Sequence, residues 1–143
     1  MSAITITRTV VADPEEVFAA WVEPGRLAAW WWPQLAGTTY DVDARPGGHY
    51  RIESPVLGVV LHGRYIEVDP PRRLAFTWVW EADGVAEPEE QVEVRLTAAA
   101  GGTLVTVVHT SAAGLEGSGV EQGWHDVLDR MVRVVGQSTS SRS

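Results

Sequence analysis

The sequence predicts an α+β fold in which a curved antiparallel sheet of about six to seven strands wraps around one long C-terminal helix. Three observations predict it. Apolar residues recur at helical spacing over residues 119–135, and short strand-like segments separated by glycine and proline fill residues 38–110. Two short helical patterns follow a first strand near the N-terminus. The connections between strands are too short for the crossover helices that parallel strands require, so we expect an antiparallel meander.

The N-terminal part predicts one strand and two short helices. Residues 3–11 alternate apolar side chains with threonine, as in a strand with one buried face. Asp13 then has the position of an N-cap, Pro14 that of the first helical residue, and Glu16 completes a capping box. The buried face of this first helix is expected to consist of Val17, Phe18 and Trp21. A second short helix is predicted over residues 26–32 and is stopped by a proline.

From residue 38 the pattern changes to strands between turn residues. The predicted strands are 40–44, 49–53, 59–68, 74–80, 91–96 and 104–110. Apolar residues occupy both alternating positions in 59–68, which suggests a bulge or burial on two sides. The acidic segment 81–90 is most simply a solvated loop, and the alternatives are a mobile lid and a patch for a basic partner. We expect one domain over residues 1–137 and a flexible tail over 138–143.

The long helix is predicted over residues 119–135. Its apolar residues recur at steps of three and four and therefore share one face: Val120, Trp124, Val127, Leu128, Met131, Val134 and Val135. The opposite face places acids four residues before bases, as in Asp126 and Arg130. At about 1.5 Å per residue the helix is long enough to cross a small domain. We expect it to lie on the concave face of the sheet.

Composition narrows the possible classes of protein. The chain has 143 residues, of which 45% are hydrophobic, and this suits a single globular domain. A formal net charge of −8 would repel phosphate backbones and anionic lipids, so no nucleic-acid partner is expected. The absence of cysteine excludes disulfides and thiol nucleophiles. Neither a membrane span nor a signal peptide is recognisable, and we expect a cytoplasmic protein.

Seven motifs occur in the order typical of one known family. They are Asp13-Pro14-Glu15-Glu16-Val17-Phe18-Ala19-Ala20-Trp21, Trp30-Trp31, Asp43-Ala44-Arg45-Pro46-Gly47-Gly48, Gly63-Arg64-Tyr65-Ile66-Glu67-Val68, Pro70-Pro71-Arg72-Arg73-Leu74-Ala75-Phe76-Thr77-Trp78, Gly102-Thr103 and Gly123-Trp124. The chain therefore resembles the Hsp90-ATPase-activator-homologue branch of the START-like, or Bet v 1-like, (SRPBCC) superfamily. The resemblance implies a helix-grip fold with a hydrophobic cavity between the sheet and the C-terminal helix. It brings no shared set of catalytic residues.

The tryptophans are the main candidates for the wall of such a cavity. Leu74, Trp78 and Trp80 share one face of a strand by alternation, and this face is either simple core or cavity lining. Trp30, Trp31 and Trp32 cannot all point inward from a helix, so at least one is exposed or guards an opening. The residues that we expect to contact a ligand are Trp31, Tyr50, Trp78, Trp80, Val107, His109, Trp124, Leu128 and Met131.

Two histidines are candidates for acid–base chemistry. His109 alternates with Val105 and Val107, so its imidazole should point toward the helix, where it could orient a ligand or move a proton. The alternative is a core histidine whose ring nitrogens are satisfied by neighbours. His62 is the second candidate, although its facing is open. The sequence shows no metal-ligand spacing and no phosphate loop, so we expect neither a metal nor a cofactor.

These observations leave three hypotheses on function. The leading one is binding of an apolar small molecule, aromatic, polyketide-like or lipid, in the cavity. The second is a cyclase, aromatase or dehydratase-type enzyme that uses the same pocket, with His109 or His62 as acid or base. The third is a co-chaperone or another protein-interaction module, which predicts an exposed apolar patch around Trp30 to Trp32 and no cavity. A homodimer is possible in each case.

Overall fold

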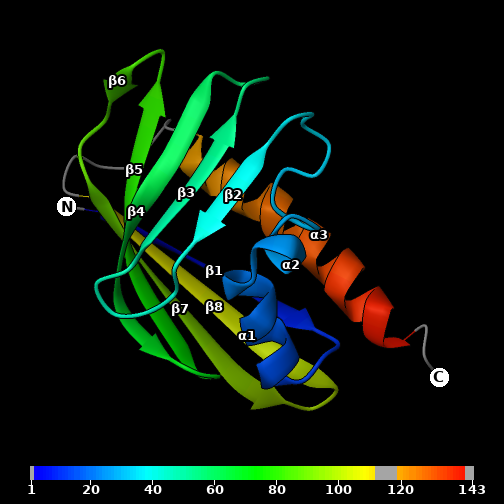
Figure 1. Ribbon diagram of the computed structural model, residues 1–143. Helices are drawn as coiled ribbons and strands as arrows, with labels where there is room; N and C mark the ends of the chain where they lie inside the picture. The colour runs from blue at the N-terminus through cyan, green and yellow to red at the C-terminus, as the bar shows by residue number, and fades with distance from the viewer. Residues whose placement is uncertain (1, 112–118, 141–143) are drawn as a thin grey trace.

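The computed structural model describes residues 2–111 and 119–140. Within them, the elements are β1 (Ser2–Val10), α1 (Pro14–Val22), α2 (Pro24–Leu27), β2 (Thr39–Val42), β3 (His49–Ser54), β4 (Val59–Asp69), β5 (Arg73–Ala82), β6 (Val85–Ala86), β7 (Glu90–Ala99), β8 (Gly102–Ser111) and α3 (Val120–Ser140). The strands form an antiparallel sheet in the order β1-β8-β7-β5-β4-β3-β2, with β6 paired to β5. Figure 1 shows α3 running diagonally beside this curved sheet, with α1 and α2 next to the helix.

The core lies between the sheet and α3, as predicted. Side chains of β8 alternate regularly between buried and half-buried positions, and those of β5 at Leu74, Phe76 and Trp78 face inward. The apolar face of α3 packs against them through Trp124, Leu128 and Met131, all at most 2% exposed. Arg8 of β1 ties the polar side of the helix to the sheet: its Nε donates to Asp129 Oδ1 over 2.7 Å. The predicted helix-grip arrangement is confirmed.

β4 contains the irregularity that its double apolar pattern suggested. The register with β5 shifts between Tyr65 and Glu67, which is a β-bulge. Before the shift, Leu61 and Tyr65 are buried on the inner face while His62 lies between them on the outer face. The bulge therefore brings Val68 into register with the inward-facing Leu74, whereas Val60 is half-buried and Ile66 is 54% exposed.

The second short helix differs from the prediction. α2 covers Pro24–Leu27 instead of residues 26–32, because Pro24 is the first helical residue and the chain leaves the helix after Leu27. Trp30 and Trp31 are both buried, and Trp30 Nε1 donates to the carbonyl of Ala20 over 2.9 Å. Trp32 has a φ of +57°, which a right-handed helix does not contain. Packing of three consecutive indoles thus takes precedence over the helical pattern.

Two boundaries also differ from the prediction. Part of the expected acidic loop 81–90 forms a hairpin, because β5 extends to Ala82 and β6 returns after the two-residue turn Asp83-Gly84. Both turn residues have positive φ, as a type I′ turn requires, and an Asp-Gly pair signals that turn. α3 ends at Ser140, so it includes the first three residues of the predicted tail, whose residues 141–143 lie outside the described part.

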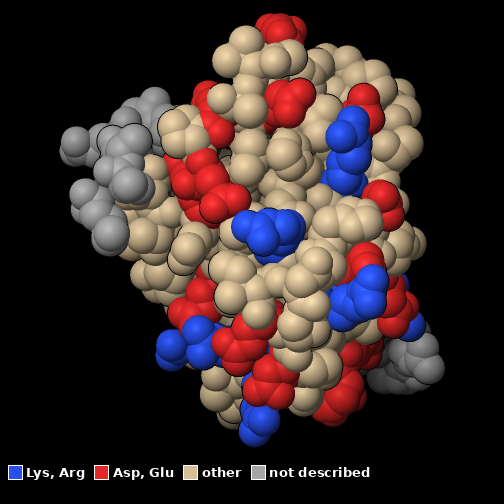
Figure 2. Space-filling view, turned by 60° about the vertical axis from the view of Figure 1, so that its left-hand side comes forward, with Lys and Arg blue, Asp and Glu red and all other residues tan. Residues whose placement is uncertain are grey.

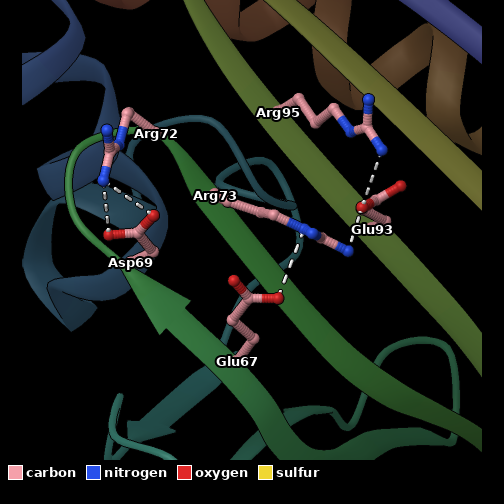
Figure 3. Close-up of polar contacts among 6 residues, drawn as sticks. All are labelled: Glu67, Asp69, Arg72, Arg73, Glu93 and Arg95. Carbon is pink, nitrogen blue, oxygen red and sulfur yellow. Dashed lines mark hydrogen bonds and ion pairs between the residues drawn. The ribbon is translucent and has the colours of Figure 1, made fainter.

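The outer face of the sheet carries paired charges. Arg73 of β5 lies between Glu67 of β4 and Glu93 of β7, and Arg95 Nη2 also contacts Glu93 Oε2 at 3.3 Å (Figure 3). Figure 2 shows acidic and basic side chains next to one another over the lower part of one face. None of the described helices is both long and apolar enough to cross a membrane.

Candidate functional site

A cavity of about 370 Å³ opens where the N-terminal half of α3 separates from β5 and from the start of β7. Residues from four parts of the chain line it: Trp31, Trp32, Trp78, Trp80, Glu87, Pro88, Glu90, Gly119, Val120, Gly123, Trp124 and Val127. Five of the seven tryptophans of the chain are among them. The cavity is therefore an aromatic chamber with an opening to solvent at the end of the sheet.

The indole rings of the cavity contact one another. Trp124 of α3 has its ring centroid 5.4 Å from those of Trp31 and Trp78. Nearer the opening, Trp32 and Trp80 meet edge to face at 6.0 Å. Such edge-to-face pairs are favourable beyond the apolar area that they bury. Alternation along β5 places Trp78 and Trp80 on the same face, so this strand supplies one wall of the cavity and α3 supplies the opposite one.

Trp32 occupies a strained backbone position at the cavity. Its φ of +57° lies in the left-handed region, which costs an L-residue about 1–2 kcal/mol and is rare for a bulky side chain. The segment before it is held by the Tyr40 hydroxyl, which donates to the carbonyl of Trp31. Trp32 remains half-buried while Trp30 and Trp31 are buried. Strain of this kind is concentrated at binding and active sites.

A chain of hydrogen bonds forms the polar part of the wall. Trp124 Nε1 donates to His109 Nδ1 over 2.9 Å, and His109 Nε2 lies 2.7 Å from Glu90 Oε1. An indole N–H can only donate, so His109 Nδ1 must carry a lone pair, and the ring proton resides on Nε2. His109 therefore donates to the Glu90 carboxylate as a neutral imidazole. Glu90, whose side chain is 18% exposed, presents this carboxylate to the cavity.

Burial lowers the pKa of His109 below its ordinary value, and the hydrogen bond with Glu90 opposes this shift without reversing it. As the pH falls through about 6.5, the imidazole of the unfolded chain takes up a proton that the native imidazole does not. The free energy of unfolding should then decrease, by at most about 1.4 kcal/mol per pH unit. The decrease should end below the native pKa, where both states carry the proton.

Urea unfolding at pH 7 and at pH 5.5 checks this expectation in the wild type and in His109→Gln, which keeps one donor and one acceptor. The variant should lose less stability between the two pH values than the wild type. An equal decrease in His109→Gln and in the wild type would contradict the buried neutral histidine.

The structure brings only part of the predicted site together. Trp31, Trp78, Trp80 and Trp124 line the cavity. Tyr50 instead borders a separate space of about 30 Å³, where its hydroxyl donates to the carbonyl of Thr77 over 2.6 Å. The remaining predicted contacts, Val107, His109, Leu128 and Met131, are at most 1% exposed and lie in the core behind the wall. His62 lies outside, with its Nε2 3.4 Å from Glu81 Oε1.

The sequence analysis left the facing of Trp32 open and did not name Glu87, Glu90 or Gly123 as ligand contacts. For Glu90 a signal existed. It alternates with Val92 and Val94 along the inner face of β7, and it pairs in register with Trp78 of β5. Reading that alternation back by one step would have placed a carboxylate on the inner face.

A curved antiparallel sheet that holds a long C-terminal helix, with a cavity between the two, defines a helix-grip protein. The family described as activator of Hsp90 ATPase homolog 1-like protein matches residues 11–136, and the chain belongs to this family. The comparison with curated protein sequences gives no match.

Solved structures show the same fold. CalU16 from Micromonospora echinospora is 28% identical, with a TM-score of 0.71, and the match covers 97% of this chain and 79% of CalU16. DynU16, described as a protein in the dynemicin biosynthetic locus, is also 28% identical, with a TM-score of 0.74 over 93% of this chain. This chain spans only 46% of DynU16. Protein CV1439 from Chromobacterium violaceum is 23% identical, with a TM-score of 0.77 over 95% of this chain and 99% of that protein.

Proposed function

We propose that the protein binds an apolar small molecule, aromatic, polyketide-like or lipid, in the tryptophan-lined cavity between the sheet and α3. The observation that carries the proposal is the cavity itself. Its volume of about 370 Å³ falls within the range of about 300–1,000 Å³ of small-molecule sites. Its walls are mainly aromatic, with few polar groups, which is the usual composition of such sites.

Two further observations support the proposal. Trp32 keeps an unfavourable backbone conformation beside the opening, which is understandable if its indole contacts a ligand. DynU16, at 28% identity, is described as belonging to a biosynthetic locus, and this is consistent with a small organic molecule as the ligand. The protein-interaction alternative predicted an exposed patch at Trp30 to Trp32, yet Trp30 and Trp31 are buried.

A cyclase-like enzyme is the second candidate, and the pair of Glu90 and His109 favours it. A carboxylate at the cavity wall, with an imidazole N–H fixed behind it, is an arrangement that can accept a proton from a bound substrate. In this reading Glu90 touches the substrate and His109 is a positioning residue. The cytoplasmic location and the possible homodimer remain predictions from the sequence.

Filling the cavity tests the proposal. A side chain at Gly123 of α3 would enter the cavity, and a Cβ added there meets no other atom within 4 Å. Gly123→Leu should therefore weaken binding of the neutral apolar dye Nile red about tenfold or more, since its side chain occupies ligand space. The fold should remain intact, because leucine favours helix over glycine by up to about 1 kcal/mol. Dye titration by fluorescence measures the affinity.

Gly123→Ala at the same position is the matched control. It adds one methyl group and should change dye affinity by much less than Gly123→Leu while stabilising the helix equally or more. Native mass spectrometry of the wild type, compared with its denatured mass, would reveal a retained ligand. Equal dye binding by the wild type and Gly123→Leu would contradict the assignment of this cavity.

A further inference from the structure

The ionisable side chains that line the cavity are all acidic. Among the described lining residues only Glu87 and Glu90 can carry a charge. All 11 lysine and arginine residues of the chain are arginine, and none of those described lines the cavity. The described part of the lining therefore offers an incoming molecule two carboxylates and no arginine.

The charge of Glu90 is not neutralised from behind. Glu90 pairs with His109, and that imidazole is neutral because its Nδ1 accepts the Trp124 N–H. A carboxylate can accept about four hydrogen bonds, and His109 supplies one of them. The Glu90 carboxylate can therefore accept further hydrogen bonds from a molecule in the cavity. Glu87 lines the same cavity, and its backbone N–H donates to the carbonyl of Trp80 over 2.8 Å.

The tryptophan rings have the same electrostatic preference as the carboxylates. The face of an indole carries partial negative charge and attracts ammonium groups, and tryptophan does so more strongly than the other aromatic residues. Trp32 and Trp80 meet at nearly right angles, 88°, so their rings present two differently oriented surfaces at the opening. Sites made of several aromatic rings are a common means of recognising quaternary ammonium ions.

We infer that the occupant of the cavity is an organic cation, namely an aromatic or alkyl amine or a quaternary ammonium compound. Its apolar part lies among the tryptophans and its charged group beside Glu90. This inference rests on the proposed function and narrows its ligand class. Fatty acids and other carboxylates of the same size should be disfavoured, because they would face Glu87 and Glu90 in a partly enclosed space where charges interact more strongly than in water.

Three molecules with the same ring system test the inference by calorimetric titration: 1-naphthylmethylammonium, 1-naphthalenemethanol and 1-naphthoate. The cation should bind about tenfold tighter than the neutral alcohol, a difference of about 1.4 kcal/mol. The carboxylate should bind more weakly than the alcohol. Because the ring is shared, differences within the series report charge and not apolar area.

Glu90→Gln tests whether the Glu90 carboxylate causes the preference for the cation over the alcohol. The glutamine oxygen can still accept from His109, so the wall is preserved while the charge is lost. The ratio of cation to alcohol affinity should fall to between one and three. Glu89→Gln is the matched control: it removes the same charge one residue away, at an exposed position that does not line the cavity. It should keep the wild-type ratio.

The outcomes separate this inference from the proposed function. Equal affinity for the cation and the alcohol, or an unchanged ratio in Glu90→Gln, would overturn the cation assignment. Failure of all three naphthalene compounds to bind would overturn it as well. In each case the apolar cavity stands if Gly123→Leu still blocks Nile red. If Nile red binding is also insensitive to that variant, the proposed function fails too.

Discussion

Replacing Trp124 with alanine should lower the free energy of unfolding by about 3–5 kcal/mol. Its indole is 2% exposed and contacts the rings of Trp21, Trp31 and Trp78. The substitution would join the cavity to the core, and it would also leave His109 Nδ1 without its donor. Loss of a partner from a buried polar atom costs about 1–3 kcal/mol. We therefore expect a value near the upper end of the range.

Trp80→Ala is the appropriate comparison, because it removes the same side chain from the same cavity. Trp80 is half-buried, and its ring contacts that of Trp32. We expect a loss of about 1–2 kcal/mol there. Urea unfolding followed by circular dichroism gives both values. Similar losses in the two variants would show that Trp124 does not connect the helix to the sheet in the way described.

The second large effect is expected at Gly63 of β4, where an alanine should cost about 3 kcal/mol or more. A Cβ at this position would lie 2.0 Å from the carbonyl oxygen of Thr77 and 2.7 Å from its carbonyl carbon. The oxygen is also held by the Tyr50 hydroxyl. Both obstructing atoms are backbone, so relief requires β4 and β5 to separate at the centre of the sheet.

Gly25→Ala controls for the general effect of replacing glycine. Gly25 lies in α2, and an added Cβ there meets no atom within 4 Å. Its stability should change by no more than about 0.5 kcal/mol in the destabilising direction. The midpoint of thermal unfolding is a sufficient measurement. A midpoint for Gly63→Ala close to that of Gly25→Ala would contradict the close approach of the two strands.

The fold was predictable because its elements are periodic. The apolar period of α3 and the alternation of β5 and β8 each specify a buried face. A helix with one apolar face and a sheet with one apolar face can bury both only by packing against each other. Errors occurred where packing competes with local preference. Residues 28–32 continue a helical pattern, yet α2 ends at Leu27, and Trp30 and Trp31 are buried in the turns that follow it. Helix propensity describes only the local preference of each residue, so it cannot predict where tertiary packing overrides that preference.

The candidate site was less predictable, for a different reason. Alternation correctly puts Val107 and His109 on the inner face, but every inner-face residue has the same pattern whether it fills core or borders a cavity. The difference depends on where α3 diverges from the sheet, which is a property of the assembled layers. Glu90 was overlooked because an acidic residue beside Glu89 suggests solvent, although its parity with Val92 indicates the interior.

The pairing of β1 with β8 has a consequence for biosynthesis. It joins Ser2 to Ser111 and Val10 to Thr103, residues separated by most of the chain. During translation at about 5–20 residues per second, β1 is therefore synthesised several seconds before β8 and has no strand to pair with in that time. Such non-local pairing also slows folding. An unpaired strand with alternating isoleucine and threonine is a template for pairing with other nascent chains. Chains released before β8 is complete should consequently aggregate instead of forming a smaller stable domain.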